Sequence, residues 1–198
     1  MKNPAIIKYA CYMSNASMSA TANISPLLFI TFHQLYGISY TLLGLLVLVN
    51  FCTQLLVDLV FSSYSHKFDI SKTIRVMPVL TIIGLVIYSL MPALFPVFTY
   101  TFFLIGTIIF SASAGLAEVL TSPVIAALPS DNPERDMSRA HSVYAWGVTA
   151  VVLLSTLYLQ VFGRETWYIL ALMWAIIPLI AFILFMSSDI PELETPKS

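Results

Sequence analysis

Charged side chains are scarce in this sequence: Asp, Glu, Lys and Arg make up only 10% of its 198 residues. A soluble domain carries roughly 25% of these residues, because its surface faces water. Apolar residues make up 59% of the chain, and the mean hydropathy is +0.88. Such a chain cannot cover its surface with polar groups. We therefore predict an integral membrane protein whose main partner is the lipid bilayer.

Cysteine is also rare, and this limits the chemistry that the chain can perform. The two cysteines, Cys11 and Cys52, lie in apolar surroundings without metal-ligand spacing, so we expect no disulfide framework and no metal site. The sequence contains neither H-E-x-x-H nor G-x-S-x-G. It has no basic patch of the kind that binds nucleic acid. We expect no cofactor, no catalytic residue and no nucleic-acid partner, and we predict that the protein is not an enzyme.

Long apolar runs, in contrast, recur along the whole chain. A helix of about 20 apolar residues crosses the hydrocarbon core of a bilayer, which is about 30 Å thick. Short links separate the runs, so consecutive helices are expected to be antiparallel neighbours. The fold prediction is an all-α membrane protein, with a six-helix transmembrane bundle over residues 1–188 and a polar cytoplasmic tail over 189–198. The predicted spans are 7–32, 40–62, 73–92, 96–128, 139–162 and 167–187.

Lysine and arginine are distributed unequally over the predicted loops. With the N-terminus in the cytoplasm, every Lys and Arg except Arg164 lies on the cytoplasmic side. An excess of these residues in short loops marks the cytoplasmic side of a membrane protein. We therefore expect both termini in the cytoplasm.

Three predicted spans carry polar side chains at helical spacing. At 3.6 residues per turn, positions three or four apart lie on one face of a helix. Lipid disfavours amides and carboxylates, so we expect these three faces to meet across a polar region. The stripes are Asn15, Ser19 and Asn23 in the first span, Asn50, Gln54 and Asp58 in the second, and Ser111, Gly115, Glu118 and Ser122 in the fourth.

Each polar side chain can serve either of two purposes. It can hydrogen-bond between helices and hold the bundle together, or it can line a cavity for a solute. We expect the first role for Asn15, whereas Asn23, Asn50 and Gln54 fit both. Asp58 lies about one turn from the cytoplasmic loop, where it can also reach water or pair with a loop cation.

Glu118 is the charged residue within the longest apolar run. Small residues precede it, and Pro123 follows five residues later. Proline disturbs helix hydrogen bonding and can free carbonyl groups toward a cavity. If the carboxylate is buried, desolvation favours its protonated form, which makes Glu118 a candidate proton carrier. The alternative is a structural carboxyl group paired with His141 or with a cytoplasmic-side arginine.

Two residues near the start of the fifth span complete the candidate site. A histidine side chain can gain or lose a proton near neutral pH, and His141 can face Glu118 across the bundle, although such a residue can also cap an interfacial helix. Trp146 can stack on a sugar-like ligand, although aromatic residues in spans mostly serve packing. The candidate solute and proton pathway therefore consists of Glu118, Asn23, Asn50, Gln54, Asp58, His141 and Trp146.

Six spans, cytoplasmic termini and a short basic loop after span two resemble the N-terminal half of a major facilitator superfamily transporter. In this family the loop reads G-x-x-x-D-R-x-G-R. Here the stretch from Ser62 to Asp69 keeps only the basic position, Lys67. An internal echo between residues 17–28 and 111–125 agrees with the three-plus-three inverted repeats from which such transporters are built.

Two further stretches are similar to the fucose permease-like branch of the family. They are G-x-x-E followed by proline, at Gly115, Glu118 and Pro123, and H-S-x-Y-A-x-G, from His141 to Gly147. The resemblance implies that Glu118 lines a central cavity and takes part in proton-coupled sugar uptake by alternating access. It also implies a location in the plasma membrane.

A typical member of this family has twelve spans, with the solute held between two six-helix halves. The resemblance therefore implies a second half as a partner, either a copy of this chain in a homodimer or a separate chain. Two alternatives remain: an inactive transporter fragment, or a membrane assembly or regulatory protein whose polar stripes only join helices. Accessibility of Glu118 to aqueous reagents distinguishes a cavity lining from such a structural role.

Overall fold

Helices make up nearly all of the computed structural model, which describes residues 4–191. Within this range it contains α-helices and short 3₁₀ turns but no strand, as the all-α prediction requires. Most of the predicted polar tail lies outside the described residues. The helices are α1 (Pro4–Leu27), α2 (Phe29–Tyr36), α3 (Tyr40–Tyr64), α4 (Ile70–Leu94), α5 (Thr99–Ala126), α6 (Pro133–Phe162), α7 (Trp167–Trp174) and α8 (Ile176–Met186). The 3₁₀ turns are η1 (Ser65–Lys67), η2 (Pro96–Phe98) and η3 (Arg164–Thr166).

Five helical segments of the described chain are long and apolar enough to cross a membrane. They span residues 40–67, 70–94, 96–126, 133–162 and 164–186, and they correspond to the second to sixth predicted spans. The segment at the predicted first span does not reach the same hydropathy, because α1 carries many hydroxyl and amide side chains. Passage of α1 through the membrane therefore remains a prediction.

Two predicted spans are interrupted helices. The first, 7–32, divides at Leu28 into α1 and α2, two residues after Pro26. The last, 167–187, divides at Ala175 into α7 and α8, three residues before Pro178. Proline lacks the N–H that would donate to the carbonyl four residues earlier, so Pro178 leaves the Trp174 carbonyl beside the second break without its helical partner.

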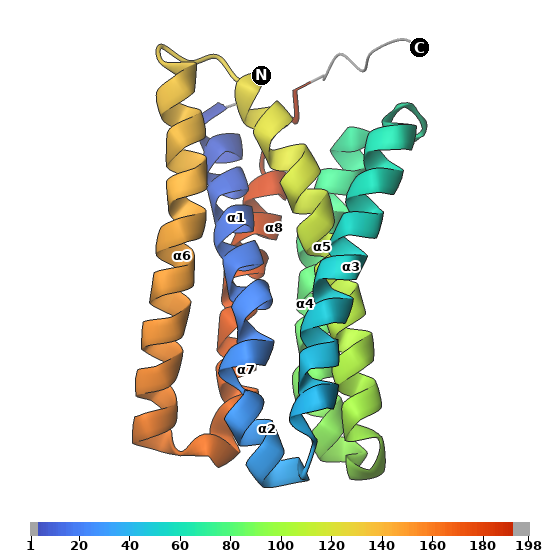
Figure 1. Cartoon of the computed structure of the whole chain (residues 1–198). Helices are drawn as coiled ribbons and strands as arrows, with labels where there is room; N and C mark the ends of the chain where they lie inside the picture. The colour runs from blue at the N-terminus through green and yellow to red at the C-terminus, as the bar shows by residue number, and fades with distance from the viewer. Residues whose placement is uncertain (1–3, 192–198) are drawn as a thin grey trace.

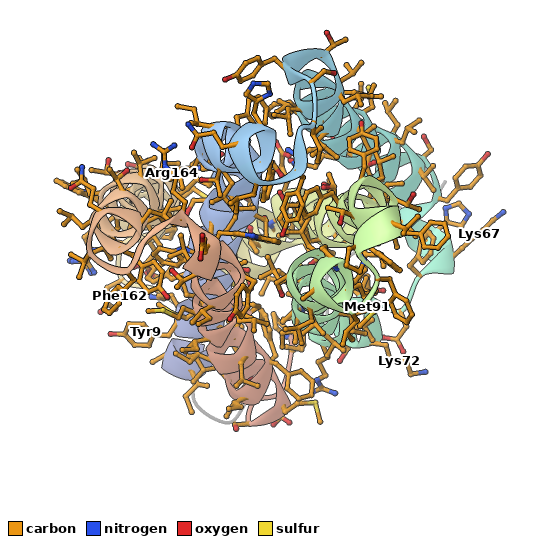
Figure 2. All side chains as sticks on the ribbon, turned by 90° about the horizontal axis from the view of Figure 1, so that it is seen from below. Tyr9, Lys67, Lys72, Met91, Phe162 and Arg164 are labelled. Carbon is orange, nitrogen blue, oxygen red and sulfur yellow. The ribbon has the colours of Figure 1, made fainter. Side chains whose placement is uncertain are left out.

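The helices form a bundle with two sides (Figure 1). In that view α1 and α6 lie on the left, α3, α4 and α5 lie on the right, and α7 and α8 pass behind α1. The start of α1 and the end of α8 lie at the same end of the bundle. Figure 2 views the opposite end and shows Arg164 beside α6, with Lys67 and Lys72 at the far edge. Which end faces the cytoplasm remains a prediction.

Close backbone contact joins α4 to α5 at two glycines. A Cβ atom on Gly84 would lie 2.7 Å from the backbone nitrogen of Phe110, and one on Gly106 would lie 2.7 Å from the Cβ atom of Tyr88. Small residues permit such close crossings in membrane bundles, where dispersion contacts supply much of the association energy. The pair fixes α5, which carries Glu118, against α4.

Asp69 starts α4. Its Oδ1 accepts a hydrogen bond from the Lys72 backbone N–H at 3.1 Å, as an N-cap aspartate does. This backbone hydrogen bond, together with the Lys72 side chain, lowers the pKa of Asp69. A lowered pKa in the folded state means that the cap stabilises the fold at neutral pH and weakens as the pH falls through that pKa.

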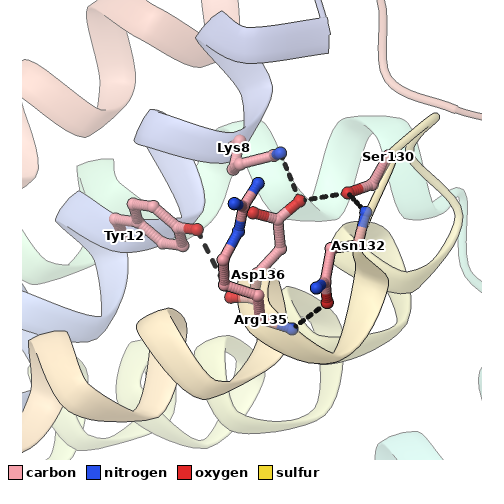
Figure 3. Close-up of polar contacts among 6 residues, drawn as sticks. All are labelled: Lys8, Tyr12, Ser130, Asn132, Arg135 and Asp136. Atoms are coloured by element: carbon pink, nitrogen blue, oxygen red, sulfur yellow. Dashed lines mark hydrogen bonds and ion pairs between the residues drawn. The ribbon is translucent and has the colours of Figure 1, made fainter.

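A buried ion pair ties the start of α6 to α1 (Figure 3). Asp136 is 2% exposed, and its carboxylate accepts from the Lys8 ammonium and, at 2.5 Å, from the Ser130 hydroxyl. The Tyr12 hydroxyl donates to the Asp136 backbone carbonyl at 3.3 Å. Ser130 also accepts from the Asn132 backbone N–H at 3.1 Å, so the α5–α6 loop joins the same network. The network sets the position of α6 and of His141, which lies five residues further on.

We expect Asp136→Ala to lower the unfolding temperature by several degrees, because it leaves the partly buried Lys8 ammonium without its counter-ion. Glu134→Ala, an exposed acid in the same turn, is the matched control. Thermal unfolding is measured in detergent. It is monitored by the labelling of the Cys11 thiol, which is buried in the folded protein, in a Cys52→Ser background. Equal unfolding midpoints for the two variants would show that the ion pair contributes little.

Candidate functional site

A polar cavity of about 670 Å³ lies between α1, α3, α5 and α6. These four helices occupy the front of the bundle in Figure 1, with α1 and α6 on one side and α3 and α5 on the other. Residues of all three predicted stripes line the cavity: Asn15 from the first span, Gln54 and Asp58 from the second, and Glu118 and Ser122 from the fourth. It is lined by Asn15, Met18, Phe51, Gln54, Leu55, Asp58, Glu118, Thr121, Ser122, His141 and Tyr144.

The position of Glu118 depends on how closely α5 approaches α3. A Cβ atom on Gly115 would lie 2.9 Å from the Gln54 backbone carbonyl oxygen and 3.1 Å from the Val57 Cβ atom. Glu118 is three residues beyond this contact, so it emerges about one turn along, beside the α3 stripe. The glycine therefore brings the carboxylate of α5 and the polar face of α3 to the same cavity.

The Glu118 side chain is exposed at the cavity wall. It has no hydrogen-bond or ion-pair partner among the described residues, so the predicted alternative pairing with His141 is not formed. A proton carrier of the predicted kind needs a buried carboxyl group, and Glu118 is exposed in the chain alone. Desolvation of this carboxylate requires something to cover the open side of the cavity.

The other titratable groups of the cavity are also accessible. Asp58 is half-buried and accepts a long hydrogen bond of 3.4 Å from the Ser62 hydroxyl in the next turn. It forms no ion pair with a loop cation in the described part of the chain. His141 is exposed and lies at the wall contributed by α6. The cavity therefore carries two carboxylates and an imidazole but no lysine or arginine.

Asn50 does not line the cavity, but it lies one turn before Gln54 on α3 and contacts it. It is 4% exposed, and its Oδ1 accepts from the Ser111 hydroxyl at 2.5 Å and from the Gln54 Nε2 at 3.0 Å. One amide oxygen thus links α3 to α5 and orients Gln54, which does line the cavity. Asn50 positions a cavity residue and does not itself contribute to the wall.

We expect Asn50→Ala and Ser111→Ala to destabilise the protein non-additively, because they remove two ends of one hydrogen bond. Interhelical hydrogen bonds in membranes give coupling energies of about 0.6 kcal/mol on average and up to about 1.7. Because this bond is buried, we expect a value of about 1 kcal/mol. A double-mutant cycle of thermal stability measures it, with Asn50→Ala combined with Ser142→Ala as the uncoupled control. A coupling of zero would contradict the assigned bond.

Asn15 lines the cavity and also joins helices, whereas Asn23 and Trp146 lie outside the wall. Asn15 joins three helices: its Nδ2 donates to the Ala140 carbonyl at 3.0 Å, and its Oδ1 accepts from the Thr121 hydroxyl at 3.2 Å. Asn23 donates to the Ser19 carbonyl of its own helix at 2.8 Å and is not part of the cavity wall. Trp146 is 73% exposed and also lies outside the wall.

Sequence reasoning left out part of the wall. Thr121, Met18, Phe51 and Leu55 line the cavity although none belongs to a predicted stripe. The helical register of α3 contains the signal for Phe51 and Leu55, because they share a face with Asp58. Within residues 4–191 no group of three or more His, Cys, Asp or Glu side chains is placed to hold a metal ion.

A bundle of membrane-length helices around a polar cavity is typical of multi-pass membrane proteins that handle a solute. The family description "Major Facilitator Superfamily" matches residues 10–198, and the chain belongs to this superfamily of transporters. The resemblance inferred from the sequence is therefore confirmed. A transporter family also agrees with the prediction that the protein is not an enzyme.

Among solved structures, the chain is similar to the major facilitator superfamily proton:xylose symporter XylE bound to 6-bromo-6-deoxy-D-glucose. The TM-score is 0.80 at 15% sequence identity, and the match covers 94% of this chain and 45% of the symporter chain. The chain thus spans a little under half the length of that structure. A search of curated proteins gave no match. The fucose permease-like branch remains a prediction.

Proposed function

We propose that the chain forms one half of a secondary transporter that moves a small polar solute by alternating access. The observation that carries the proposal is the cavity: side chains from four helices converge on it, and Glu118 and His141 are exposed there. In transporters of this architecture the solute binds near the bilayer midplane between two halves, which rock around it. Six membrane crossings with both termini in the cytoplasm form part of the same proposal.

The charge of the cavity indicates the kind of solute. Asp58 and Glu118 contribute carboxylates, whereas no lysine or arginine lies in the wall to neutralise an anion. A solute rich in hydroxyl groups fits this lining, because carboxylates, amides and hydroxyls can exchange hydrogen bonds with it. The sugar ligand in the similar symporter structure supports a sugar as the solute.

Glu118 is the residue that couples transport to protons in this proposal. Its carboxylate faces the cavity without a protein partner, so a second half closing over it removes its water. Desolvation disfavours the charged form of a carboxylate, and closure therefore favours proton uptake. Opening returns the group to water and releases the proton.

The partners follow from the incomplete enclosure of the cavity. A second six-helix half, from a copy of this chain or from a separate chain, covers the open side, and lipid surrounds the assembly in the plasma membrane. Two copies in the same orientation form this arrangement by a two-fold axis along the membrane normal.

The proposal is tested by uptake of a panel of labelled sugars into proteoliposomes, with and without an imposed proton gradient. The chain is reconstituted alone and after co-expression with candidate second halves. Gradient-driven uptake of at least one sugar is expected in one of these preparations. No uptake by folded protein in any of them would contradict the proposal.

One alternative has an observation in its favour. The side-chain amides of Asn15 and Asn50 form hydrogen bonds between helices. Such contacts are expected of a membrane assembly or regulatory protein that transports nothing, or of an inactive fragment. In that case the cavity holds no solute, and a panel of sugars leaves the unfolding temperature unchanged.

A further inference from the structure

An apolar groove runs along the flank of α3 that faces away from the polar cavity. Its volume is about 510 Å³, and it lies between α3 and α4 with Leu116 of α5 also contributing. Leu56 and Val60 line the groove, whereas Asp58 lies between them in sequence and lines the cavity. Residues two apart point to nearly opposite faces of a helix. The groove and the cavity therefore share α3 as a common wall.

The two ends of this groove differ in chemistry. Toward the membrane interior, Leu56, Val60 and Val76 are 62%, 50% and 51% exposed and offer only hydrocarbon. At the end nearest the α3–α4 loop, Lys72 and Thr73 contribute an ammonium and a hydroxyl group. A long molecule with an apolar tail and a polar head matches this gradient.

Aromatic packing closes the loop end of the groove. The rings of Phe61 and Phe68 stack with centroids 5.2 Å apart, and both belong to the groove lining. This stack holds the loop between α3 and α4 against α3. Lys72, four residues after Phe68, therefore stays at the groove, which it lines. Lys67, the last residue of η1, lies with its ammonium 4.9 Å from the centre of the Tyr64 ring.

The charge at this end favours an anion. Residues 65–75 contain one acid, Asp69, and three cations; Arg75 donates to the Ser188 backbone carbonyl at 3.1 Å, which leaves Lys67 and Lys72 at this end. Lys72 Nζ lies 3.2 Å from Asp69 Oδ2, yet the Lys72 side chain remains 82% exposed and can contact a second anion. Figure 2 shows Lys67 and Lys72 projecting from the same edge of the bundle. Basic residues near the end of a membrane helix attract anionic lipid headgroups.

We propose that this groove is a binding site for one anionic phospholipid. An acyl chain lies along Leu56, Val60 and Val76, and the phosphate lies at Lys72 within reach of Lys67. The Thr73 hydroxyl is a further donor for the headgroup. Since α3 separates the groove from the cavity, an occupied groove supports the helix that carries Gln54 and Asp58.

Native mass spectrometry of the detergent-purified chain tests the site. The probes are phosphatidylglycerol and phosphatidylcholine with identical acyl chains. We expect phosphatidylglycerol to bind at least about tenfold more tightly, and Lys72→Gln to lower its affinity about fivefold. Val60→Trp fills the groove and should abolish the tight site. Arg139→Gln and Ile183→Trp are the matched controls, because both residues are exposed and lie on other helices.

Equal affinity for the two lipids would overturn the proposal, as would equal losses in the test and control variants. A photoreactive benzoylphenylalanine at Val76 provides a second readout in native membranes. Adducts enriched in anionic phospholipid, relative to the same probe at Ile183, support the site. Adducts to a second protein chain, or no enrichment, would show that the groove serves another purpose. Neither readout depends on transport, so failure of this proposal is distinguishable from failure of the proposed function.

Discussion

Glu118→Gln is expected to lower gradient-driven uptake at least about a hundredfold while preserving exchange of solute across the membrane. Glutamine keeps the size of the side chain and, like the protonated acid, can donate and accept hydrogen bonds, but it cannot carry a proton. If Glu118 couples transport to protons, the variant can still alternate with solute bound, but a proton gradient no longer drives it. The measurement compares gradient-driven uptake with equilibrium exchange in the same proteoliposomes.

The control for this prediction is Glu165→Gln, an exposed acid in the turn between α6 and α7. It should leave both activities unchanged. Loss of exchange together with uptake would assign Glu118 to solute binding and not to coupling. Full gradient-driven uptake in Glu118→Gln would remove the residue from the mechanism and return it to a structural role.

Gly106→Leu is expected to abolish folding of the bundle. A Cβ atom at this position would lie 2.8 Å from the Gly84 carbonyl oxygen and 2.9 Å from the Tyr88 Cα atom, so backbone, and not a movable side chain, blocks it. Overpacking a core costs about 1–3 kcal/mol when side chains can yield, and more when helices must separate. The α4–α5 crossing has no such freedom, because glycine occupies both sides of the contact.

Gly44→Leu is the matched control. Gly44 lies in α3, and a Cβ atom there would meet nothing within 4 Å. We expect this variant to purify as a monodisperse protein with a near-native unfolding temperature, whereas Gly106→Leu should aggregate in size-exclusion chromatography. A folded Gly106→Leu protein would mean that the two helices are farther apart than the structure places them.

The apolar spans could be predicted because their length and hydropathy are visible in the sequence, but α1 shows the limit of that signal. Several of its polar groups bond within their own helix: the Ser14 hydroxyl donates to the Ala10 carbonyl, and the Asn23 amide donates to the Ser19 carbonyl. Groups satisfied in this way fit inside a bundle although they lower the hydropathy of the segment. For a helix that is surrounded by other helices, mean hydropathy is therefore a poor guide to whether the helix can lie within the membrane.

The polar stripes lie on α1, α3 and α5, which are three of the four helices around the cavity, but no stripe marks α6. The sequence pattern of α6 does not show which face of the helix points toward the cavity. A contact with another helix is needed to fix its rotation. That contact is Gly147, where a Cβ atom would lie 2.3 Å from the Ser19 hydroxyl oxygen. Because Gly147 faces α1 so closely, its neighbour Trp146 is turned away from the cavity.

Long-range polar partners could not be predicted from spacing at all. Asp136, in the first turn of α6, has the position of an ordinary acid that complements the helix dipole. Its partner Lys8 lies 128 residues earlier in the chain, and only the packing of α1 against α6 brings the two together. The same holds for Asn50 and Ser111, which are 61 residues apart.

If α3 and α5 line a water-filled cavity in the membrane, cysteines placed on the cavity wall are accessible to water-soluble reagents. Gln54→Cys and Ser122→Cys are introduced in a Cys52→Ala background, where the remaining Cys11 is buried. Ile183→Cys, on the exposed face of α8, is the lipid-facing control. A membrane-impermeant maleimide should label both cavity positions in intact membranes and leave Ile183→Cys unlabelled. Cavity cysteines that react no faster than this control would contradict a water-filled cavity and assign the polar stripes to helix association.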